Sequence, residues 1–129
     1  MAVNSQKVDY YPTALIVEDN ADLANVFSFA LREAGFEIDT VLDGRGAMLR
    51  LEAFIPEVIV LDLHLPHVSG REILEFVLAD DRFEQTQIII ASADHHLAKE
   101  LENDDIIVLI KPVSFKQLRD LSSRLKVRS

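Results

Sequence analysis

The sequence predicts an α/β fold in which a parallel sheet is covered by helices on both faces. Five short apolar stretches alternate with five segments of helical periodicity, the order that gives parallel strands joined by crossover helices. The central stretch, residues 58–62, is apolar until its last residue, as expected of a strand buried on both faces. Four of the five stretches end in a polar or charged residue, which indicates that reactive groups collect at one edge of the sheet.

The predicted strands are short and rich in β-branched residues. They cover residues 13–17, 36–41, 58–62, 87–91 and 106–110. The second of them alternates apolar and polar residues, which predicts a less buried position near an edge.

Start and stop residues bound the five predicted helices. Asn20 is expected to cap a first helix that ends at Gly35 as its C-cap. Ser69, with Glu72 three residues later, predicts a capping box at the third helix. The other helices are expected from Asp43 to Pro56, over residues 94–102, and after Ser114. With right-handed crossovers, the whole pattern favours a flavodoxin-like doubly wound sheet in the order 2-1-3-4-5, a three-layer α/β/α architecture with five helices.

Length and composition fit a single domain. Residues 1–12 show no periodicity and are expected to be an extended or mobile lead-in, followed by one domain over residues 13–126. The chain of 129 residues has no cysteine and no apolar run of membrane-spanning length, so we expect a cytoplasmic protein that does not contact a membrane. A net charge of −9 argues against direct binding of nucleic acid.

The polar residues that end the strands form one constellation. Glu18 and Asp19 follow the first strand, and Asp62 ends the third. Ser92 ends the fourth strand, and Lys111 follows the fifth. Because the carboxyl ends of parallel strands share one edge, these groups are expected to converge. Neighbouring carboxylates repel unless a cation lies among them, and Mg²⁺ is the simplest hard ion for oxygen ligands. The set suits a phosphoryl group carried on a carboxylate.

Taken singly, each of these residues has an ordinary structural explanation. Acids are favoured at the start of a helix, a serine is common in turns, and a lysine before proline can simply be solvated. All of these coinciding at one edge is improbable, so the combination carries the functional interpretation.

The chain resembles the receiver domain of two-component response regulators over about residues 13–126. The resemblance rests on Glu18-Asp19, on Asp62-Leu-His-Leu-Pro-His-Val-Ser-Gly70, on Ser92-Ala93 and on Lys111-Pro112. It implies a signalling domain rather than an enzyme, with slow self-dephosphorylation at most. Asp62 is then the acceptor of a phosphoryl group from a histidine kinase or a histidine phosphotransfer protein. Ser92 and Lys111 read the phosphorylated state.

The resemblance also implies a metal site. Asp19 and Asp62 bind Mg²⁺ directly, together with the backbone carbonyl of His64, and Glu18 acts through water. No pair of histidines has the spacing of a metal site, so the imidazoles themselves are not expected to bind an ion. The resemblance further implies a cis peptide bond between Lys111 and Pro112.

Four departures from the family pattern stand out. Glu18 replaces the commoner aspartate, and Val108 occupies the place of an aromatic switch three residues before Lys111. The segment between Ser92 and Lys111 is short and carries Asn103-Asp104-Asp105 before the last strand. No output domain follows residue 129, so we expect either a stand-alone receiver or one cut from a longer regulator.

Two other functional classes stay open. One is a pseudo-receiver, a protein-interaction module that is not phosphorylated, which Val108 and the short fourth helix favour weakly. The other is an aspartyl-phosphate hydrolase or a flavodoxin-like cofactor binder. A hydrolase is expected to carry a second acid at position 64, where this chain has histidine, and a flavin binder needs hydroxyl-rich phosphate loops. The sequence names neither the kinase nor the downstream target, and it leaves a homodimer open.

Overall fold

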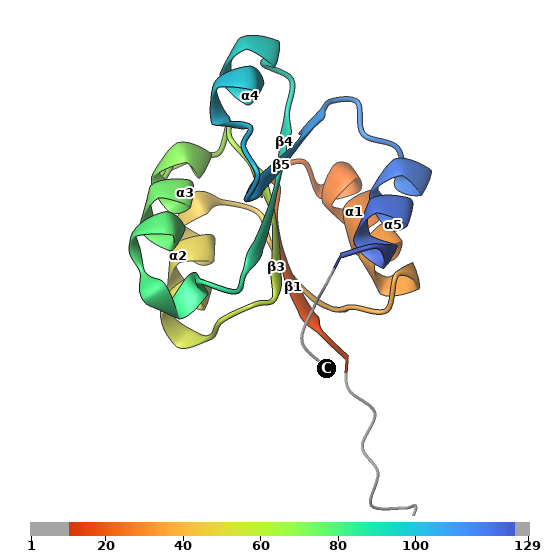
Figure 1. The fold of residues 1–129 in the computed structure, drawn as a ribbon, viewed down its shortest axis with the longest axis horizontal. Helices are drawn as coiled ribbons and strands as arrows, with labels where there is room; N and C mark the ends of the chain where they lie inside the picture. Colours follow the sequence, from red (N-terminus) through yellow and green to blue (C-terminus); the bar gives the residue numbers. More distant parts are fainter. Residues whose placement is uncertain (1–10, 126–129) are drawn as a thin grey trace, which may run out of the picture.

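The structure, a computed structural model, describes residues 11–125 and contains a five-stranded parallel sheet between two layers of helices (Figure 1). The strands are β1 Thr13–Val17, β2 Glu37–Val41, β3 Val58–Asp62, β4 Gln87–Ser92 and β5 Ile106–Ile110. The helices are α1 Ala21–Glu33, α2 Gly44–Ala53, α3 Gly70–Ala79, α4 His95–Leu101 and α5 Phe115–Ser123, with a short 3₁₀ turn, η2, at Asp81–Phe83. The strand order β2-β1-β3-β4-β5 confirms the predicted architecture. Most of the predicted lead-in, residues 1–10, lies outside the described residues.

Local capping explains where the first and third helices begin. The side chain of Asn20 accepts a hydrogen bond from the backbone N–H of Leu23 at 3.0 Å. The predicted capping box of Ser69 and Glu72 is present in both directions. The predicted C-cap of α1 is wrong by one residue, because Ala34 is the cap. Gly35 follows it with a φ of 99°, the left-handed conformation that glycine adopts without a steric penalty.

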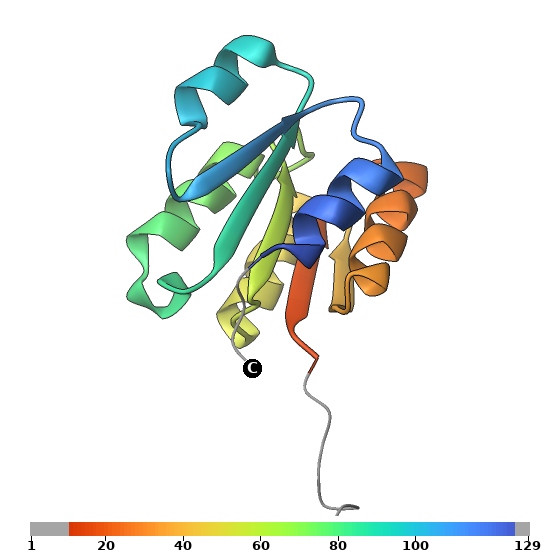
Figure 2. The same ribbon diagram turned by 45° about the vertical axis from the view of Figure 1, so that its right-hand side comes forward.

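The sheet separates two apolar cores, one on each face (Figures 1 and 2). On one face α2, α3 and α4 lie against the sheet, and buried side chains such as Leu51, Ile73 and Ile90 form the core. On the other face α1 and α5 pack side by side, with Phe27 and Leu118 buried against the sheet. β1 and β3 contribute to both cores, which is why they are continuously apolar.

The register of the central strands aligns their carboxyl ends. Val17 pairs with Leu61, so the residues that follow them, Glu18 and Asp62, lie beside each other. Asp62 in turn pairs with Ala91, immediately before Ser92. The predicted convergence of strand ends is therefore a direct result of the pairing.

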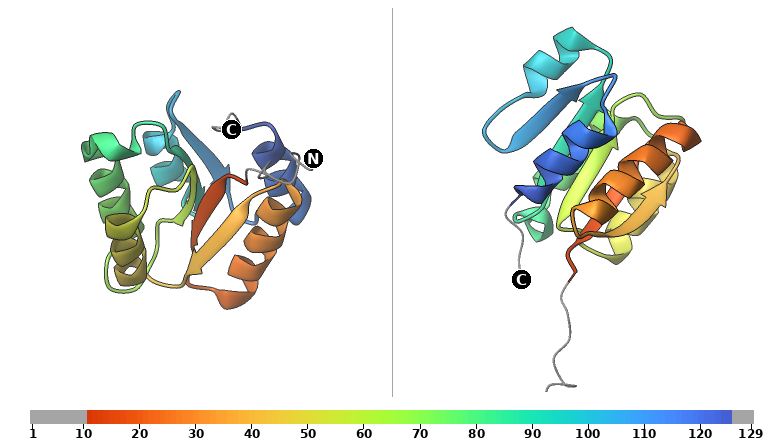
Figure 3. Two further views of the ribbon diagram at one scale, coloured as in Figure 1. Left: turned by 90° about the horizontal axis from the view of Figure 1, so that it is seen from below. Right: turned by 90° about the vertical axis from the view of Figure 1, so that its right-hand side faces the viewer.

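Helix α4 differs from the other helices in its length and position. It has seven residues and stands over the carboxyl end of the sheet (Figure 3), on the side where α3 begins (Figure 1). Only Ala98 of this helix is buried, while Leu97 and Leu101 are partly covered. Among residues 11–125, no helix combines the length and apolar character needed to cross a membrane.

Candidate functional site

Three carboxylates meet at the carboxyl ends of β1 and β3. One oxygen from each of Glu18, Asp19 and Asp62 can be chosen so that all three lie within 4.8 Å of one another. Glu18 and Asp62 are 1% and 4% exposed, whereas Asp19 is exposed. We expected Asp62 at an exposed rim. It does end the strand, but its side chain is buried.

Lys111 approaches these acids from the end of β5. Its Nζ donates a hydrogen bond to Glu18 Oε1 at 2.8 Å and lies 3.5 Å from Asp62 Oδ2. The lysine side chain is 20% exposed, so the cation is largely enclosed. Three carboxylates and one ammonium group leave a formal charge of −2 at this end of the sheet.

Burial and pairing act against each other at Glu18 and Lys111. Burial raises the pKa of the Glu18 carboxyl above its ordinary value, and the hydrogen bond from Lys111 only partly offsets this. Burial acts to lower the pKa of Lys111, but the hydrogen bond to Glu18 and the charge of Asp62 outweigh it and raise that pKa. Lys111 therefore stays cationic, whereas ionisation of the buried Glu18 carboxyl costs free energy.

The loop after Asp62 is fixed by two close backbone approaches. The N–H of Gly70 donates to Leu63 O at 3.1 Å, and a Cβ on Gly70 would collide with the carbonyl oxygen of Asp62. A Cβ on Gly44 would collide with the carbonyl oxygen of Val68 in the same way. Both glycines are needed because α2 and α3 begin against this loop.

Ser92 and His64 each take part in a local hydrogen bond after a strand of the site. The hydroxyl oxygen of Ser92, which is fully buried, accepts a hydrogen bond from the N–H of Asp94 at 3.0 Å. The N–H of His64 donates to Asp62 Oδ1 at 3.1 Å. The two oxygens of Asp62 are thus distinguished, since Oδ1 faces a backbone donor and Oδ2 faces Lys111.

The donor set fits a hard divalent cation. Within residues 11–125, the only group of at least three potential ligands that converges in this way consists of oxygen donors, and no histidine belongs to it. Oxygen-only sites with few protein ligands suit Mg²⁺, which retains several waters. Both oxygens of Glu18 already have partners, Lys111 for Oε1 and the N–H of Asn20 for Oε2 at 3.2 Å.

The predicted convergence of Glu18, Asp19 and Asp62 with Lys111 is present, but the contacts of Glu18 were not predicted. The residue was expected to serve a metal through water, and its buried ion pair with Lys111 was not foreseen. The end of the first strand did indicate such a pair, because Glu18 directly follows four residues that are all buried. A carboxylate in that position needs a partner inside the fold.

Comparison with known proteins gives a consistent match. The family model of the response regulator receiver domain matches residues 14–122. The sensory transduction protein RegX3 of Mycobacterium tuberculosis is 34% identical over 110 residues, which is 82% of this chain and 47% of that protein. The phosphate regulon transcriptional regulatory protein PhoB of Rhizobium meliloti is 32% identical over 112 residues, or 83% of this chain and 48% of that protein. This chain therefore spans about half the length of these curated relatives.

The fold also matches solved structures. The chemotaxis response regulator CheY4 of Vibrio cholerae superposes with a TM-score of 0.77 at 23% sequence identity, covering 89% of this chain and 98% of that one. At this identity the likeness establishes the shared fold alone. The fold, the order of the strands and the family match agree with one another.

Proposed function

The chain belongs to the receiver domain family of two-component response regulators, and we propose that it accepts a phosphoryl group on Asp62 from a histidine kinase or a histidine phosphotransfer protein. The observation that carries this proposal is the position of Asp62. It is the one carboxylate of the cluster that ends a core strand, contacts both a backbone N–H and Lys111, and pairs in register with the segment that leads to Ser92.

The proposed transfer is a displacement at phosphorus. An oxygen of the Asp62 carboxylate attacks the phosphoryl group, and a P–O bond forms as the P–N bond to the donor histidine breaks. The electron pair of that P–N bond stays on the imidazole nitrogen. Lys111, at 3.5 Å from Asp62 Oδ2, is placed to neutralise the charge on the phosphoryl oxygens.

We propose that Asp19 and Asp62 hold Mg²⁺ directly, with the backbone carbonyl of His64, and that Glu18 acts through water. The exposure of Asp19 and the existing bonds of both Glu18 oxygens support this division of roles. A bound Mg²⁺ supplies positive charge to the phosphoryl oxygens and to the acidic cluster.

Ser92 and Lys111 are proposed to report phosphorylation. The Ser92 hydroxyl accepts a bond from Asp94, the residue whose side chain caps α4. If the hydroxyl turns toward a phosphoryl oxygen, the start of α4 loses that bond. Val108 is partly buried in the neighbouring core and is stiff at χ1, so we propose a route through residues 93–105 instead of an aromatic gate.

The proposal is tested by incubating the protein with acetyl phosphate and Mg²⁺ and measuring its intact mass. One phosphoryl group is expected on the wild type and none on Asp62→Asn. Asp94→Asn is a suitable control, because it makes the same chemical change outside the cluster and asparagine also caps helices. The alternative is a pseudo-receiver, which Val108 and the seven-residue α4 favour. In that case neither the wild type nor either variant acquires a phosphoryl group.

A further inference from the structure

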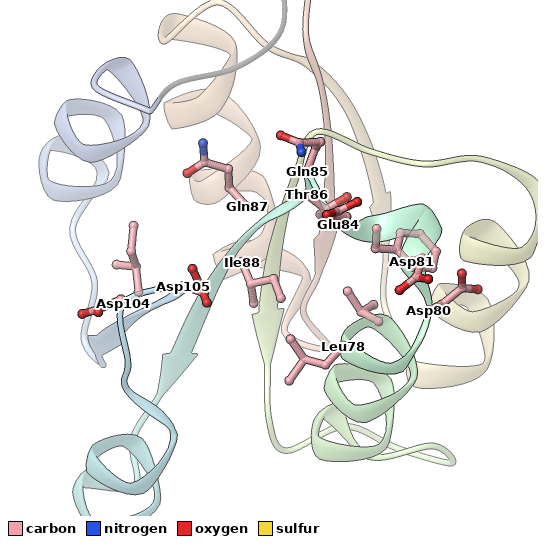
Figure 4. A pocket seen from close by; sticks show the side chains of 13 residues that line it. Leu78, Asp80, Asp81, Glu84, Gln85, Thr86, Gln87, Ile88, Asp104 and Asp105 are labelled. Atoms are coloured by element: carbon pink, nitrogen blue, oxygen red, sulfur yellow. The ribbon is translucent and has the colours of Figure 1, made fainter.

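A groove of about 500 Å³ lies at the end of the sheet opposite to the acidic cluster, at the amino ends of β4 and β5 (Figure 4). It runs from the end of α3, across β4, to the turn before β5. Its apolar lining consists of Val77, Leu78, Phe83, Ile88 and Ile107. Leu78 is 57% exposed, so its side chain is available to an occupant.

Five carboxylates line this groove. Asp80, Asp81 and Glu84 come from the α3–β4 connection, and Asp104 and Asp105 from the turn before β5. Figure 4 shows Asp104 and Asp105 on one side and Asp80 and Asp81 on the other, with Ile88 and Leu78 between them. The groove thus offers apolar surface between two acidic walls.

These charges are mostly uncompensated. Asp80 is paired with Arg82, whose Nε lies 3.0 Å from Asp80 Oδ2 and whose guanidinium also covers the ring of Phe83. Within residues 11–125, the other four carboxylates form no ion pair, and the lining contains neither lysine nor arginine. An occupant that brings cations is therefore favoured over a neutral or anionic one.

A metal ion does not fit this arrangement. The carboxylates of the groove do not converge as metal ligands do, since within the described residues only the Glu18 cluster has that geometry. They are spread along two walls. The apolar lining between the walls further favours an occupant with apolar side chains.

We propose that this groove binds a segment of a partner protein in which lysine or arginine residues flank an aliphatic side chain. The aliphatic side chain packs on Leu78 and Ile107, and the cations face Asp81 and Glu84 on one wall and Asp104 and Asp105 on the other. A second copy of this chain is a poorer occupant. Its net charge of −9 opposes docking on an acidic groove.

The groove lies away from the proposed phosphorylation site. It is at the amino ends of β4 and β5, whereas Asp62 lies at the carboxyl end of β3. A partner held here leaves the acidic cluster open to a phosphodonor.

The test uses a blocked hexapeptide of alternating lysine and leucine, titrated at low ionic strength into the isotope-labelled protein and followed by NMR. Shifts are expected at Leu78, Ile88 and residues 104–105. The double variant Asp104→Asn/Asp105→Asn is expected to weaken binding about fivefold, since each exposed pair contributes little. Leu78→Ser is expected to weaken it further.

Matched controls remove the same number of carboxylates, or one exposed leucine, from another part of the surface. Glu37→Gln/Glu52→Gln removes two exposed carboxylates near the other edge of the sheet, and Leu49→Ser replaces a leucine that is 59% exposed on α2. Both controls are expected to bind the peptide as the wild type does. Asp62→Asn is also expected to bind normally, so failure of the phosphoacceptor proposal and failure of this one are separable.

Several outcomes overturn the proposal. Equal weakening in the groove variants and their controls indicates general attraction to an acidic protein. Equal binding of spermine, or of a peptide with serine in place of leucine, shows that the apolar surface contributes nothing. Shifts centred on Glu18 and Asp62 place the peptide at the other cluster. Concentration-dependent shifts at the groove without peptide indicate a second copy as the occupant.

Discussion

The two ends of the sheet carry acidic residues in very different settings. At the carboxyl ends, Glu18 and Asp62 are buried, converge with Asp19 and enclose Lys111. At the amino ends, the acids of the groove are largely exposed and spread over two walls around Leu78. Convergence and burial raise the cost of charge, which favours an ion and specific chemistry. Dispersion and exposure favour a broad surface for another protein. Residue type alone does not separate these two uses.

The tight packing of the site end gives the largest expected effect. Gly70→Ala is expected to destabilise the fold by about 3 kcal/mol, because its Cβ meets the backbone carbonyl of Asp62. Gly46→Ala is the control, since its Cβ has nothing nearer than Asp43 Oδ1 at 3.4 Å. That change inside α2 is expected to stabilise by roughly 0.5–1 kcal/mol. Urea unfolding measures both, and similar values for the two variants would contradict the close packing at Gly70.

Metal binding is expected to distinguish the two acidic clusters. At an Mg²⁺ concentration a hundred times the dissociation constant, the native state is expected to gain about 2.7 kcal/mol. Asp19→Asn is expected to abolish this gain, and Glu18→Gln to reduce it less, because both Glu18 oxygens already have partners. Asp104→Asn is the control and keeps the full gain. Thermal unfolding with and without Mg²⁺ provides the measurement. Loss of the gain in Asp104→Asn would show that the two acidic clusters do not differ in Mg²⁺ binding. A larger loss in Glu18→Gln than in Asp19→Asn would reverse the roles of those two residues.

Two ion pairs of equal length test the effect of burial directly. Lys111 contacts Glu18 at 2.8 Å in the site, and Lys116 contacts Asp120 at 2.8 Å on the surface. Lys111→Met is expected to cost about 2 kcal/mol, less than for a fully enclosed pair because the lysine is partly exposed. Lys116→Met is expected to have no measurable effect, since its side chain is 77% exposed. Chemical denaturation compares them, and equal losses would show that burial of the Lys111–Glu18 pair does not matter.

The smallest expected effect is at α4, which stands over the carboxyl end of the sheet (Figure 1). Beryllofluoride with Mg²⁺ mimics a phosphoryl group, and it is expected to change amide exchange most in residues 93–105 and little around Val108. The helix has few apolar anchors, so small changes in free energy at Ser92 can alter its order. Amide exchange in α1 serves as the internal reference. Unchanged exchange in residues 93–105, with a change on another face, would contradict this route.

The strand pattern was sufficient to predict the sheet order and the convergence of Glu18, Asp19, Asp62 and Lys111, because parallel strands bring their carboxyl ends to one edge. The burial of individual polar side chains could not be predicted in this way. The burial of Asp62 and the pairing of Glu18 with Lys111 depend on side-chain positions that a strand pattern does not specify. The groove was not predicted, because its acids come from two segments that are separate in the sequence. The predicted pairing of the fourth and fifth strands could have revealed it, since that pairing brings the two segments side by side.

The central claim is that Asp62 alone carries the phosphoryl group. The most direct test is to phosphorylate the protein with a histidine-linked phosphodonor and Mg²⁺, reduce the acyl phosphate with borohydride, and locate the modified residue by peptide mass spectrometry. Homoserine is expected at position 62, and unmodified aspartate and glutamate elsewhere, including Glu18, Asp19 and the acids of the groove. Homoserine at another position, or the same amount of reduction product in Asp62→Asn, would contradict it.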